Sequence, residues 1–373
     1  MTSTECEALM VLNAIPGLTP RRIKRLIRYF GSAARILNSK RQELLEAGVV
    51  PQEIIERMLE FDRDYFVRDE WRLIRQHGAA VIAFDAPDYP FLLKEIPDAP
   101  VLLYVKGRYH QADNLSLAVV GSRRSSLYGL TMAREFAGQL AELGFTVVSG
   151  LARGIDTAAH QGCLAAQSRT LAVLGCGLSQ IYPRENERLG DEIAAHGAIL
   201  SEFPMTMPPK AQHFPQRNRI ISGLTLGVLV IEAARRSGAL ITSRYALEQG
   251  REVFALPGRA KDPQSQGTNG LIQQGAKLVT GVADILEELQ TQVKVVTDRV
   301  CGTREGKTER ADVQAEFTPD ERAVMGIITH HACTIEVLAA QIPKPLNQLM
   351  SVLLGLEMKN KVRKLPGMLF APA

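Results

Sequence analysis

Four short glycine-rich segments, each after an apolar β-like run, contain most of the candidate binding residues of this chain. Because ligands of an open parallel sheet bind beyond the carboxyl ends of its strands, these segments are expected to meet at one edge. Small residues let backbone N–H groups approach an anion, and the positive end of a helix dipole attracts it further. Any α/β protein can have such turns, but four of them beside arginines favour an anion-binding site. The segments are GSRRSSLYG (121–129), GLARGIDTAAH (150–160), CGLSQIYP (176–183) and AARRSGALITS (233–243), and the arginines are Arg123, Arg124, Arg153, Arg235 and Arg236.

The segment HFPQRNR (213–219) combines an aromatic ring with two arginines and an amide. Nucleic-acid bases stack on aromatic faces, and guanidinium groups hold phosphates through paired hydrogen bonds. The alternative is structural, with Phe214 in the core and the arginines in a salt-bridge network. Three carboxylates that follow β-like runs could pair with arginines and stiffen the site, namely Asp156, Glu202 and Glu232.

Patterns typical of catalytic or metal sites are sparse. The sequence has no P-loop, and segment 175–180 has Gln180 where a dinucleotide-binding fingerprint needs glycine or alanine. His160 is either a base or, more commonly at such a helix position, a hydrogen-bonded structural residue. A hydrolase with Glu202 and Glu232 as acid and base is the weaker alternative, because no Ser–His or Cys–His pair accompanies them. The sequence therefore predicts no catalytic residue, no metal site and no cofactor.

The composition is that of a packed, soluble protein. The 373 residues suffice for two or three domains, and 46% apolar with 23% charged residues exclude a disordered or fibrous chain. The net charge is only +4, so a nucleic-acid partner would depend on a local basic patch. Five separated cysteines without a C-x-x-C pair favour a reducing compartment. No basic leader or membrane-spanning apolar run occurs, so we expect a cytoplasmic protein without membrane contact.

An alternation of β-like runs and helical stretches begins at about residue 79. It predicts a mostly parallel sheet. Several runs are apolar at nearly every position, as strands covered by helices on both faces must be. The runs are AVIAF, LSLAVV, FTVVS, TLAVLG, AILS, LGVLVIE and EVFALPG.

The first 75 residues contain an internal repeat, in which residues 17–30 and 48–61 align without gaps. Each copy has a glycine, a proline near the first helical position and apolar residues at helical spacing, which predicts a turn followed by a short helix. Between Arg21 and Arg41 the chain holds eight basic residues and no acid. We expect this basic copy to add a second phosphate contact, and the alternative is a solvated helix face.

The C-terminal part divides into a polar stretch and a small folded segment. Residues 291–316 are polar and lack an obvious periodicity, which predicts a linker. Three helical segments and two short β-like runs around Pro366-Gly367 follow in residues 317–373. Three helices and a hairpin predict a winged-helix domain.

Six longer motifs resemble, in order, those of the DNA processing protein A family, also called DprA or Smf, over roughly residues 80–290. The resemblance implies an α/β protein with an extended Rossmann-like, mostly parallel core in residues 76–290. It also implies a helical domain of the sterile-alpha-motif or helix-hairpin-helix type in residues 1–75 and a winged helix in 317–373. The motifs are VVGSRRSSLYG, VVSGLARGIDTAAHQGCL, TLAVLGCGLSQIYPRENERL, ILSEFP, FPQRNRIISGLTLGVLVIEAARRSGALITSRYALEQGREVFALPG and QGTNGLIQQGA.

The resemblance implies a single-stranded DNA-binding protein of natural transformation, which protects incoming DNA and loads the RecA recombinase onto it. Family members form homodimers and have no established catalytic role, so we expect a binding protein rather than an enzyme. Asp156, Glu202 and Glu232 are the expected supporting carboxylates. The DNA- and phosphate-binding residues carried over by motif are Gly121, Ser122, Arg123, Ser149, Gly150, Arg153, Gly154, Phe214, Arg217, Asn218, Arg219, Ser237 and Gly238.

Rossmann-like phosphoribohydrolases, which cleave nucleoside monophosphates, are the alternative class. They use an arginine–glutamate pair beside a PGGxGT turn. The corresponding segment 256–259 reads LPGR and lacks the second glycine, and Gly267-Thr268 is too distant to complete the turn. The enzyme is therefore the weaker alternative.

Overall fold

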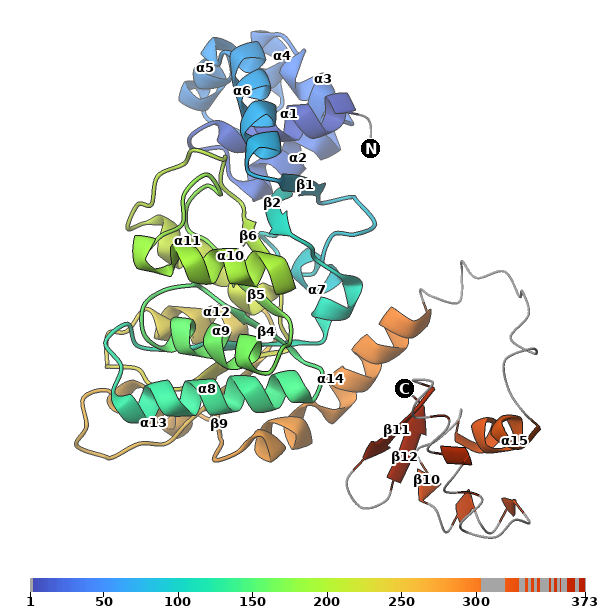
Figure 1. Ribbon diagram of the computed structural model, residues 1–373. Coiled ribbons are helices and arrows are strands. Elements are labelled where there is room, and N and C mark those ends of the chain that lie inside the picture. Colours follow the sequence, from blue (N-terminus) through green and yellow to red (C-terminus); the bar gives the residue numbers. More distant parts are fainter. Residues whose placement is uncertain are drawn as a thin grey trace. The chain divides into compact units, whose positions relative to one another are not determined.

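The computed structural model contains two compact units, Met1–Gly302 and Thr303–Ala373, which are described separately (Figure 1). It describes residues 3–302 without a break. In the second unit it describes 319–328, 333–334, 337–338, 341–342, 349, 352–353, 356, 361–365 and 369–372.

A nine-stranded sheet forms the centre of the first unit, in the order β1-β2-β6-β5-β4-β3-β7-β8-β9. The seven strands that follow β2 in this order, from β6 through β5, β4, β3, β7 and β8 to β9, are parallel to one another. Strand β2 pairs antiparallel with both of its neighbours, β1 and β6. All seven expected β-like runs form strands, which confirms the mostly parallel α/β sheet. The strands are β1 (Ala79–Ala83), β2 (Leu102–Gly107), β3 (Ser116–Val120), β4 (Thr146–Ser149), β5 (Thr170–Val173), β6 (Ala198–Ser201), β7 (Gly227–Val230), β8 (Glu252–Ala255) and β9 (Lys277–Leu278).

Helices cover both faces of the sheet, which is why its central strands are buried at every position and mostly apolar. Leu117 and Val119 of β3 pack in the cluster of α8, α9 and α14, whereas Ala118 and Val120 pack in the cluster of α11 and α12. Figure 1 shows α8, α9 and α10 in front of the sheet. The helices are α7 (Phe91–Lys94), α8 (Leu127–Glu142), α9 (Ile155–Ala165), α10 (Glu187–His196), α11 (His213–Gly223), α12 (Ala239–Glu248), α13 (Gln266–Gln273) and α14 (Val282–Gly302), with 3-10 turns η1 (Gln111–Asn114) and η2 (Arg184–Asn186).

The linker expected from residue 291 is wrong for its first part, because α14 continues to Gly302. Val293, Val296 and Val300 pack in the cluster of α8 and α9, with Val296 only 2% exposed. These valines recur at helical spacing, a weak periodicity hidden among polar residues. The remainder of the expected linker, 303–316, lies outside the described residues.

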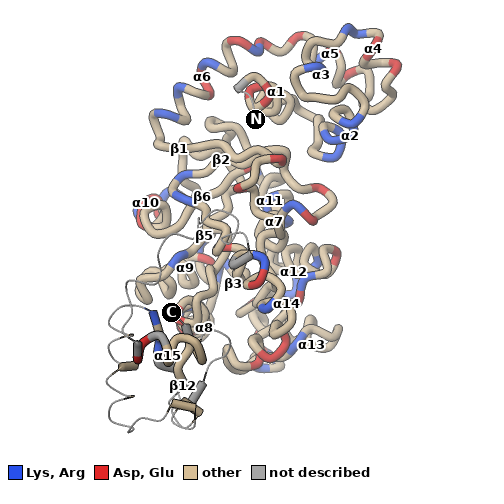
Figure 2. The backbone as a smooth tube through the Cα atoms, turned by 90° about the vertical axis from the view of Figure 1, so that its right-hand side faces the viewer, with Lys and Arg blue, Asp and Glu red and all other residues tan. Residues whose placement is uncertain are grey.

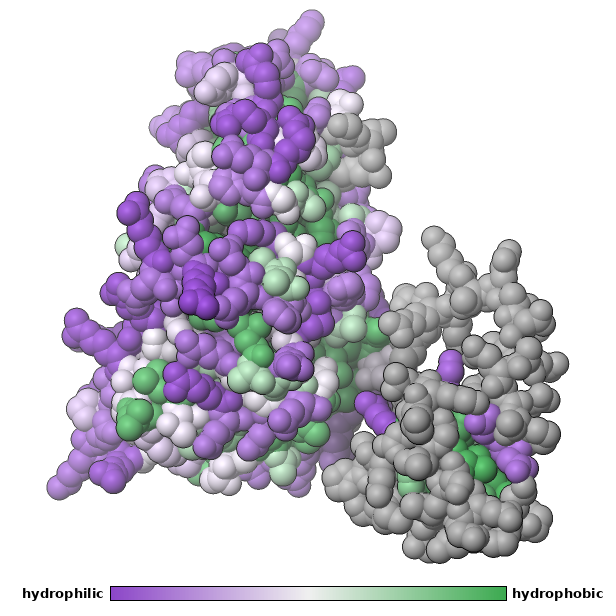
Figure 3. Space-filling view, viewed as in Figure 1, coloured by the Kyte–Doolittle hydropathy of each residue, from purple (hydrophilic) through white to green (hydrophobic). Residues whose placement is uncertain are grey.

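Six helices precede the sheet and share a hydrophobic core with it. The tandem repeat is confirmed in α2 and α5: Pro20 is the first residue of α2, and Pro51 directly precedes α5. Leu12 of α1 lies in one cluster with Tyr104 of β2. Figure 3 shows a mainly hydrophilic outer surface over this part of the molecule. The helices are α1 (Ser3–Ala14), α2 (Pro20–Phe30), α3 (Ala33–Leu37), α4 (Arg41–Glu46), α5 (Gln52–Glu60) and α6 (Arg63–Gln76).

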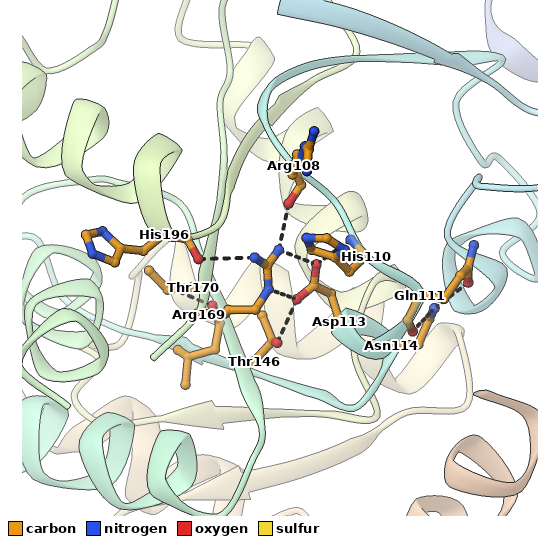
Figure 4. Close-up of polar contacts among 10 residues, drawn as sticks. Arg108, His110, Gln111, Asp113, Asn114, Thr146, Arg169, Thr170 and His196 are labelled. Carbon is orange, nitrogen blue, oxygen red and sulfur yellow. Dashed lines mark hydrogen bonds and ion pairs between the residues drawn. The ribbon is translucent and has the colours of Figure 1, made fainter. Parts of the chain in front are cut away.

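An ion pair between half-buried Arg169 and buried Asp113 joins the amino ends of the parallel strands, opposite the edge expected to bind ligand (Figure 4). Arg169, just before β5, donates to both carboxylate oxygens of Asp113 at 2.7 and 2.8 Å. Asp113 also accepts from the hydroxyl of Thr146 in β4, at 2.9 Å. Arg169 further donates to the carbonyl oxygens of Arg108 and His196. One guanidinium therefore connects η1, β4, β5 and the end of α10.

The second unit contains α15 (Pro319–Ile328) and a three-stranded antiparallel sheet in the order β10-β12-β11. Val324 and Ile328 of α15 pack in one cluster with Phe370 of β12. The expected hairpin is formed by β11 (Val362–Leu365) and β12 (Leu369–Pro372), and β10 is Cys333–Thr334. Much of the other two expected helices lies outside the described residues. No helix in the described part of the chain is long and apolar enough to cross a membrane.

Candidate nucleic-acid interface

A cavity of about 840 Å³ lies where the loops after β3 and β7 meet α11. Its lining contains four arginines and a single acid. Three of these arginines, Arg123, Arg124 and Arg236, are exposed, whereas Arg217 is buried. The polar and aromatic lining residues are Ser122, Arg123, Arg124, Asp156, Tyr182, Phe214, Arg217, Asn218, Arg236, Ser237, Thr242 and Gln264.

Glu232, at the end of β7, holds the loop that carries Arg123. The hydroxyl and backbone N–H of Ser126 donate to the two Glu232 carboxylate oxygens, and the Ser122 N–H donates to the Glu232 carbonyl at 2.8 Å. Gly129 follows in α8, and a Cβ there would collide with the same carboxylate. The expectation that Glu232 orients an arginine is therefore wrong, because its side chain is taken up by Ser126.

Gly150, at the end of β4, separates a buried cation from a buried acid. Arg217 of α11 donates to the Gly150 carbonyl at 2.8 Å and to the Val173 carbonyl, while Asp156 accepts from the Gly150 N–H at 3.1 Å. A Cβ on Gly150 would meet both the guanidinium and the carboxylate. Only glycine fits between the two side chains. A larger residue at position 150 would displace the Arg217 guanidinium from the carbonyl oxygens that hold it at the cavity wall.

Burial shifts the pKa of both charged groups. It raises the pKa of Asp156, and the nearby Arg217 guanidinium opposes that rise. It lowers the pKa of Arg217 to about 10, with Asp156 acting in the other direction. Arg217 therefore stays protonated at neutral pH and contributes a positive charge to the floor of the cavity, beside the Asp156 carboxyl group.

Phe214 presents an aromatic surface at the cavity. Its ring is half-buried on Gly175, where a Cβ would come within 3.0 Å of the ring. The Arg123 guanidinium lies 5.1 Å from the ring centroid, and the Tyr182 ring lies 5.6 Å away at a tilt of 39°. The tyrosine is 44% exposed. Two aromatic rings and a guanidinium plane thus stand together where a base could stack.

Nine of the residues expected from the sequence line this cavity, and several do not. The hydroxyl of Ser149 is turned into the sheet and donates to the Val119 carbonyl. Arg153 is exposed and pairs with Glu185 through two hydrogen bonds of 2.7 and 2.8 Å. Gly150, Gly154, Glu202 and Glu232 support neighbouring segments rather than the lining. The nine are Gly121, Ser122, Arg123, Asp156, Phe214, Arg217, Asn218, Ser237 and Gly238.

Arg219 does not face the cavity. It is 3% exposed and pairs with Glu202 of the segment after β6, and its Nε lies 3.3 Å from Asp98. Burial raises the pKa of Glu202, and Arg219 opposes the rise. Residues two apart on a helix point in different directions, so Arg217 and Arg219 cannot serve the same site. The structural alternative therefore holds for Arg219.

Tyr182, Arg124, Arg236 and Gln264 also line the cavity and were not among the contacts carried over by motif. The two arginines stand in the basic turns that the sequence singled out, next to Arg123 and Ser237. Tyr182 is the last residue but one of the third glycine-rich segment, and an aromatic residue after a strand-end turn was the available signal. Gln264 had no signal, because it lies in a loop far along the chain.

Two groups that could act as a base or a nucleophile, His160 and Cys176, are buried. His160 is fully buried, hydrogen-bonded to Thr170 at 2.8 Å, and burial lowers its pKa to about 3. Burial raises the pKa of the Cys176 thiol to about 11. Gly258, in the segment compared with a PGGxGT turn, exchanges two hydrogen bonds with Asn269. Among the described residues, no group of three or more His, Cys, Asp or Glu is arranged to hold a metal ion.

The fold and the cavity define a class: an extended Rossmann-like α/β protein with a cationic, aromatic pocket at the carboxyl edge of its sheet. The chain belongs to the DprA family, since the family model for DNA recombination-mediator protein A matches residues 80–290. A second family model, for the DprA winged helix domain, matches residues 308–368. The expected family and the expected winged helix are therefore confirmed.

Similar proteins agree with this assignment. Protein Smf of Escherichia coli (strain K12) is 41% identical over 302 residues, which cover 79% of this chain and 78% of the relative. An X-ray structure of DNA processing protein A from Streptococcus pneumoniae is 39% identical with a TM-score of 0.67, covering 77% of this chain and 98% of that one. A Helicobacter pylori structure, described as showing the unique single-stranded DNA binding mode of that protein, is 30% identical with a TM-score of 0.52, covering 57% and 96%.

Proposed function

We propose that this protein binds single-stranded DNA in the 840 Å³ cavity. The observation that carries the proposal is the meeting of four arginines with Phe214 and Tyr182 in one concave site. Guanidinium groups neutralise phosphates, and exposed rings stack on unpaired bases regardless of their identity. The binding mode described for the Helicobacter pylori relative supports the same ligand here.

The exposed and the buried arginines of the cavity have different roles in this proposal. Arg123, Arg124 and Arg236 are exposed and can follow a moving backbone, so they contact phosphates. Arg217 is fixed by carbonyl oxygens and supplies charge at the floor. Bases in a duplex are stacked on each other and cannot reach Phe214, which predicts a preference for single strands.

The test is a titration of labelled single- and double-stranded oligonucleotides by fluorescence anisotropy at several salt concentrations. The variant is Arg123→Gln/Arg236→Gln, and the matched control is Arg134→Gln/Arg188→Gln, which removes two exposed arginines from α8 and α10. Losing two phosphate contacts should weaken binding and flatten the log–log salt slope by about 1.4. A variant that binds like its control, or equal affinity for duplex and single strand, contradicts the proposal.

We propose a binding role rather than catalysis at this site. The rival phosphoribohydrolase predicts that AMP is cleaved to adenine and ribose 5-phosphate. Incubation with AMP, followed by chromatography, should return AMP unchanged. Cleavage that disappears in the Glu202→Gln variant would favour the enzyme, since Glu202 is the buried acid of the Arg219 pair.

We further propose that the bound strand is passed to RecA and that the protein acts as a homodimer. The support is membership of a family whose model is described as a recombination mediator. The protein should raise the DNA-dependent ATPase of RecA on single strands covered by single-strand-binding protein, and it should sediment as a dimer. An unchanged ATPase rate refutes the transfer, and a monomer at micromolar concentration refutes the dimer.

A further inference from the structure

The exposed side of α2 carries three arginines in a row. Arg21, Arg25 and Arg28 are exposed and recur at intervals of four and three residues, so they share one face of the helix. Ile23 and Leu26, on the opposite face, are fully buried. Tyr29, beside Arg28, is 59% exposed. We call Arg21, Arg25, Arg28 and Tyr29 the α2 face; Figure 2 shows the Lys and Arg positions of α2 gathered at one side of the helical part.

The structure distinguishes these three arginines from Arg22, Arg35 and Arg41 of the 21–41 run. Arg41 pairs with Glu56 at 2.7 Å, and Arg35 lies 3.7 Å from Glu43. Arg22 donates to the carbonyl of Gly17 at 2.8 Å. Within residues 3–302, by contrast, Arg21, Arg25 and Arg28 form no ion pair and no side-chain hydrogen bond. The charges and hydrogen-bond donors of these three arginines are therefore available to an anionic ligand.

Neighbouring cations add to the charge of the α2 face. Lys24 is half-buried with its Nζ 3.6 Å from the centroid of Phe84, and Lys94 of α7 lies 5.1 Å from the same ring. The pKa of Lys24 is lowered to about 8, first by burial and then by Arg219, Arg28 and Lys94, against the opposing effect of Asp98. Cations this crowded repel one another, so an anionic ligand at this place is stabilised by relieving that repulsion.

One helix connects this region to the cavity. Phe214 and Arg217 of α11 line the cavity, and Arg219, on the same helix, is close enough to Lys24 to lower its pKa. At 1.5 Å per residue, the step from Phe214 to Arg219 is about 8 Å along the helix axis. Both regions belong to the compact unit 1–302.

We propose that the α2 face binds the phosphate backbone of single-stranded DNA that extends beyond the cavity. This inference rests on the proposed function and adds a second, sequence-independent contact to it. The three arginines span about 10 Å of helix, which suits a ligand with regularly repeated charges. Tyr29 offers a stacking surface at the same place, which favours a nucleic acid over an acidic peptide.

Deletion of residues 1–75 does not test the α2 face alone, because this helical part also packs against the sheet and hydrogen-bonds to the segment after β6. Glu70 of α6 accepts from the Met205 N–H at 2.8 Å, and Asn13 donates to the Glu202 carbonyl at 2.8 Å. Removing residues 1–75 would also expose Tyr104, which is fully buried. Substitutions on the exposed face leave these contacts intact.

The experiment compares Arg21→Gln/Arg25→Gln/Arg28→Gln with Arg68→Gln/Arg72→Gln/Arg75→Gln. The control removes the same charge from exposed positions of α6 in the same helical part. Both variants and the wild type are titrated with oligothymidylates of about 6 and about 30 nucleotides, which fill the cavity alone or extend beyond it. Melting temperatures confirm that both variants are folded.

We expect the α2 variant to bind the short oligonucleotide like the wild type and the long one more weakly. The log–log salt slope of its affinity for the long oligonucleotide should be flatter by about 2. The ratio of wild-type to variant affinity should therefore fall roughly 20-fold between 50 and 200 mM salt. Equal behaviour of the two triple variants overturns the inference. The inference is also overturned if polyglutamate displaces the long oligonucleotide as effectively as unlabelled DNA does, because the α2 face would then suit acidic proteins.

These outcomes separate the inference from the proposed function. If only the Arg123→Gln/Arg236→Gln variant loses affinity, the cavity stands and the α2 face is refuted. If only the α2 variant loses affinity, the cavity is refuted as the binding site. Loss in both, with the length dependence confined to the α2 variant, supports the two-contact arrangement.

Discussion

Replacement of Phe214 tests whether its ring stacks on a base. The ring is half-buried, lies against Gly175, and faces Arg123 and Tyr182. Base stacking on an aromatic ring contributes about 1–3 kcal/mol, whereas an exposed cation–π contact contributes about 0.5–1 kcal/mol. Stacking therefore dominates, and Phe214→Ala should raise the Kd for single-stranded DNA about 5- to 150-fold.

Two further variants isolate the aromatic contribution. Phe214→Leu keeps apolar bulk over Gly175 but loses the π face, so it should bind nearly as weakly as Phe214→Ala. Phe214→Tyr keeps the face and should bind like the wild type. Anisotropy and thermal melting are measured on the same samples, because the structural alternative predicts lost stability instead. Normal affinity in folded Phe214→Ala and Phe214→Leu would refute the stacking role.

Three other substitutions test the supporting structure. Gly150→Ala should weaken DNA binding more than tenfold, because its Cβ displaces Arg217; unchanged affinity by anisotropy would show that the guanidinium can move without cost. Arg169→Ala breaks the ion pair with buried Asp113 and should lower the free energy of unfolding by about 3 kcal/mol in urea titrations, while the folded protein binds DNA normally. His160 has its folded-state pKa lowered to about 3, below the ordinary value of about 6.5, so the unfolded chain protonates first. The stabilisation that neutral His160 provides is complete above pH 6.5 and is lost as pH falls toward 3, by up to about 1.4 kcal/mol per pH unit, and His160→Gln should show a flatter acid profile.

Much of the architecture could be predicted because burial on both faces leaves a direct mark on the residues. Strands such as β3 and β7 are buried at every position and almost entirely apolar, and the glycine-rich turns after them mark the carboxyl edge. Two strands were missed. β9 has only two residues, too few to show a strand pattern. β2 has an apolar run, which is a strand signal, at its start. The linker was placed too early because three valines carry the helical signal of α14 among polar neighbours.

The site could be predicted as a set of loops but not as a set of contacts. Arg217 and Arg219 look equivalent in HFPQRNR, yet only tertiary packing decides that one lines the cavity and the other pairs with Glu202. Glu232 looked like a partner for arginine, and the nearby Ser126 occupies it instead. Side-chain direction depends on helix phase and on partners distant in the chain, which local patterns do not contain.

Photochemical crosslinking tests the central claim most directly. Ultraviolet irradiation of the protein with oligothymidylate, followed by proteolysis and mass spectrometry, identifies the residues that stack on bases. The account predicts crosslinks at Tyr182 and Phe214, which stand together at the cavity, and their loss in the Arg123→Gln/Arg236→Gln variant. Crosslinks confined to residues outside the cavity, and unaffected by that variant, would contradict it.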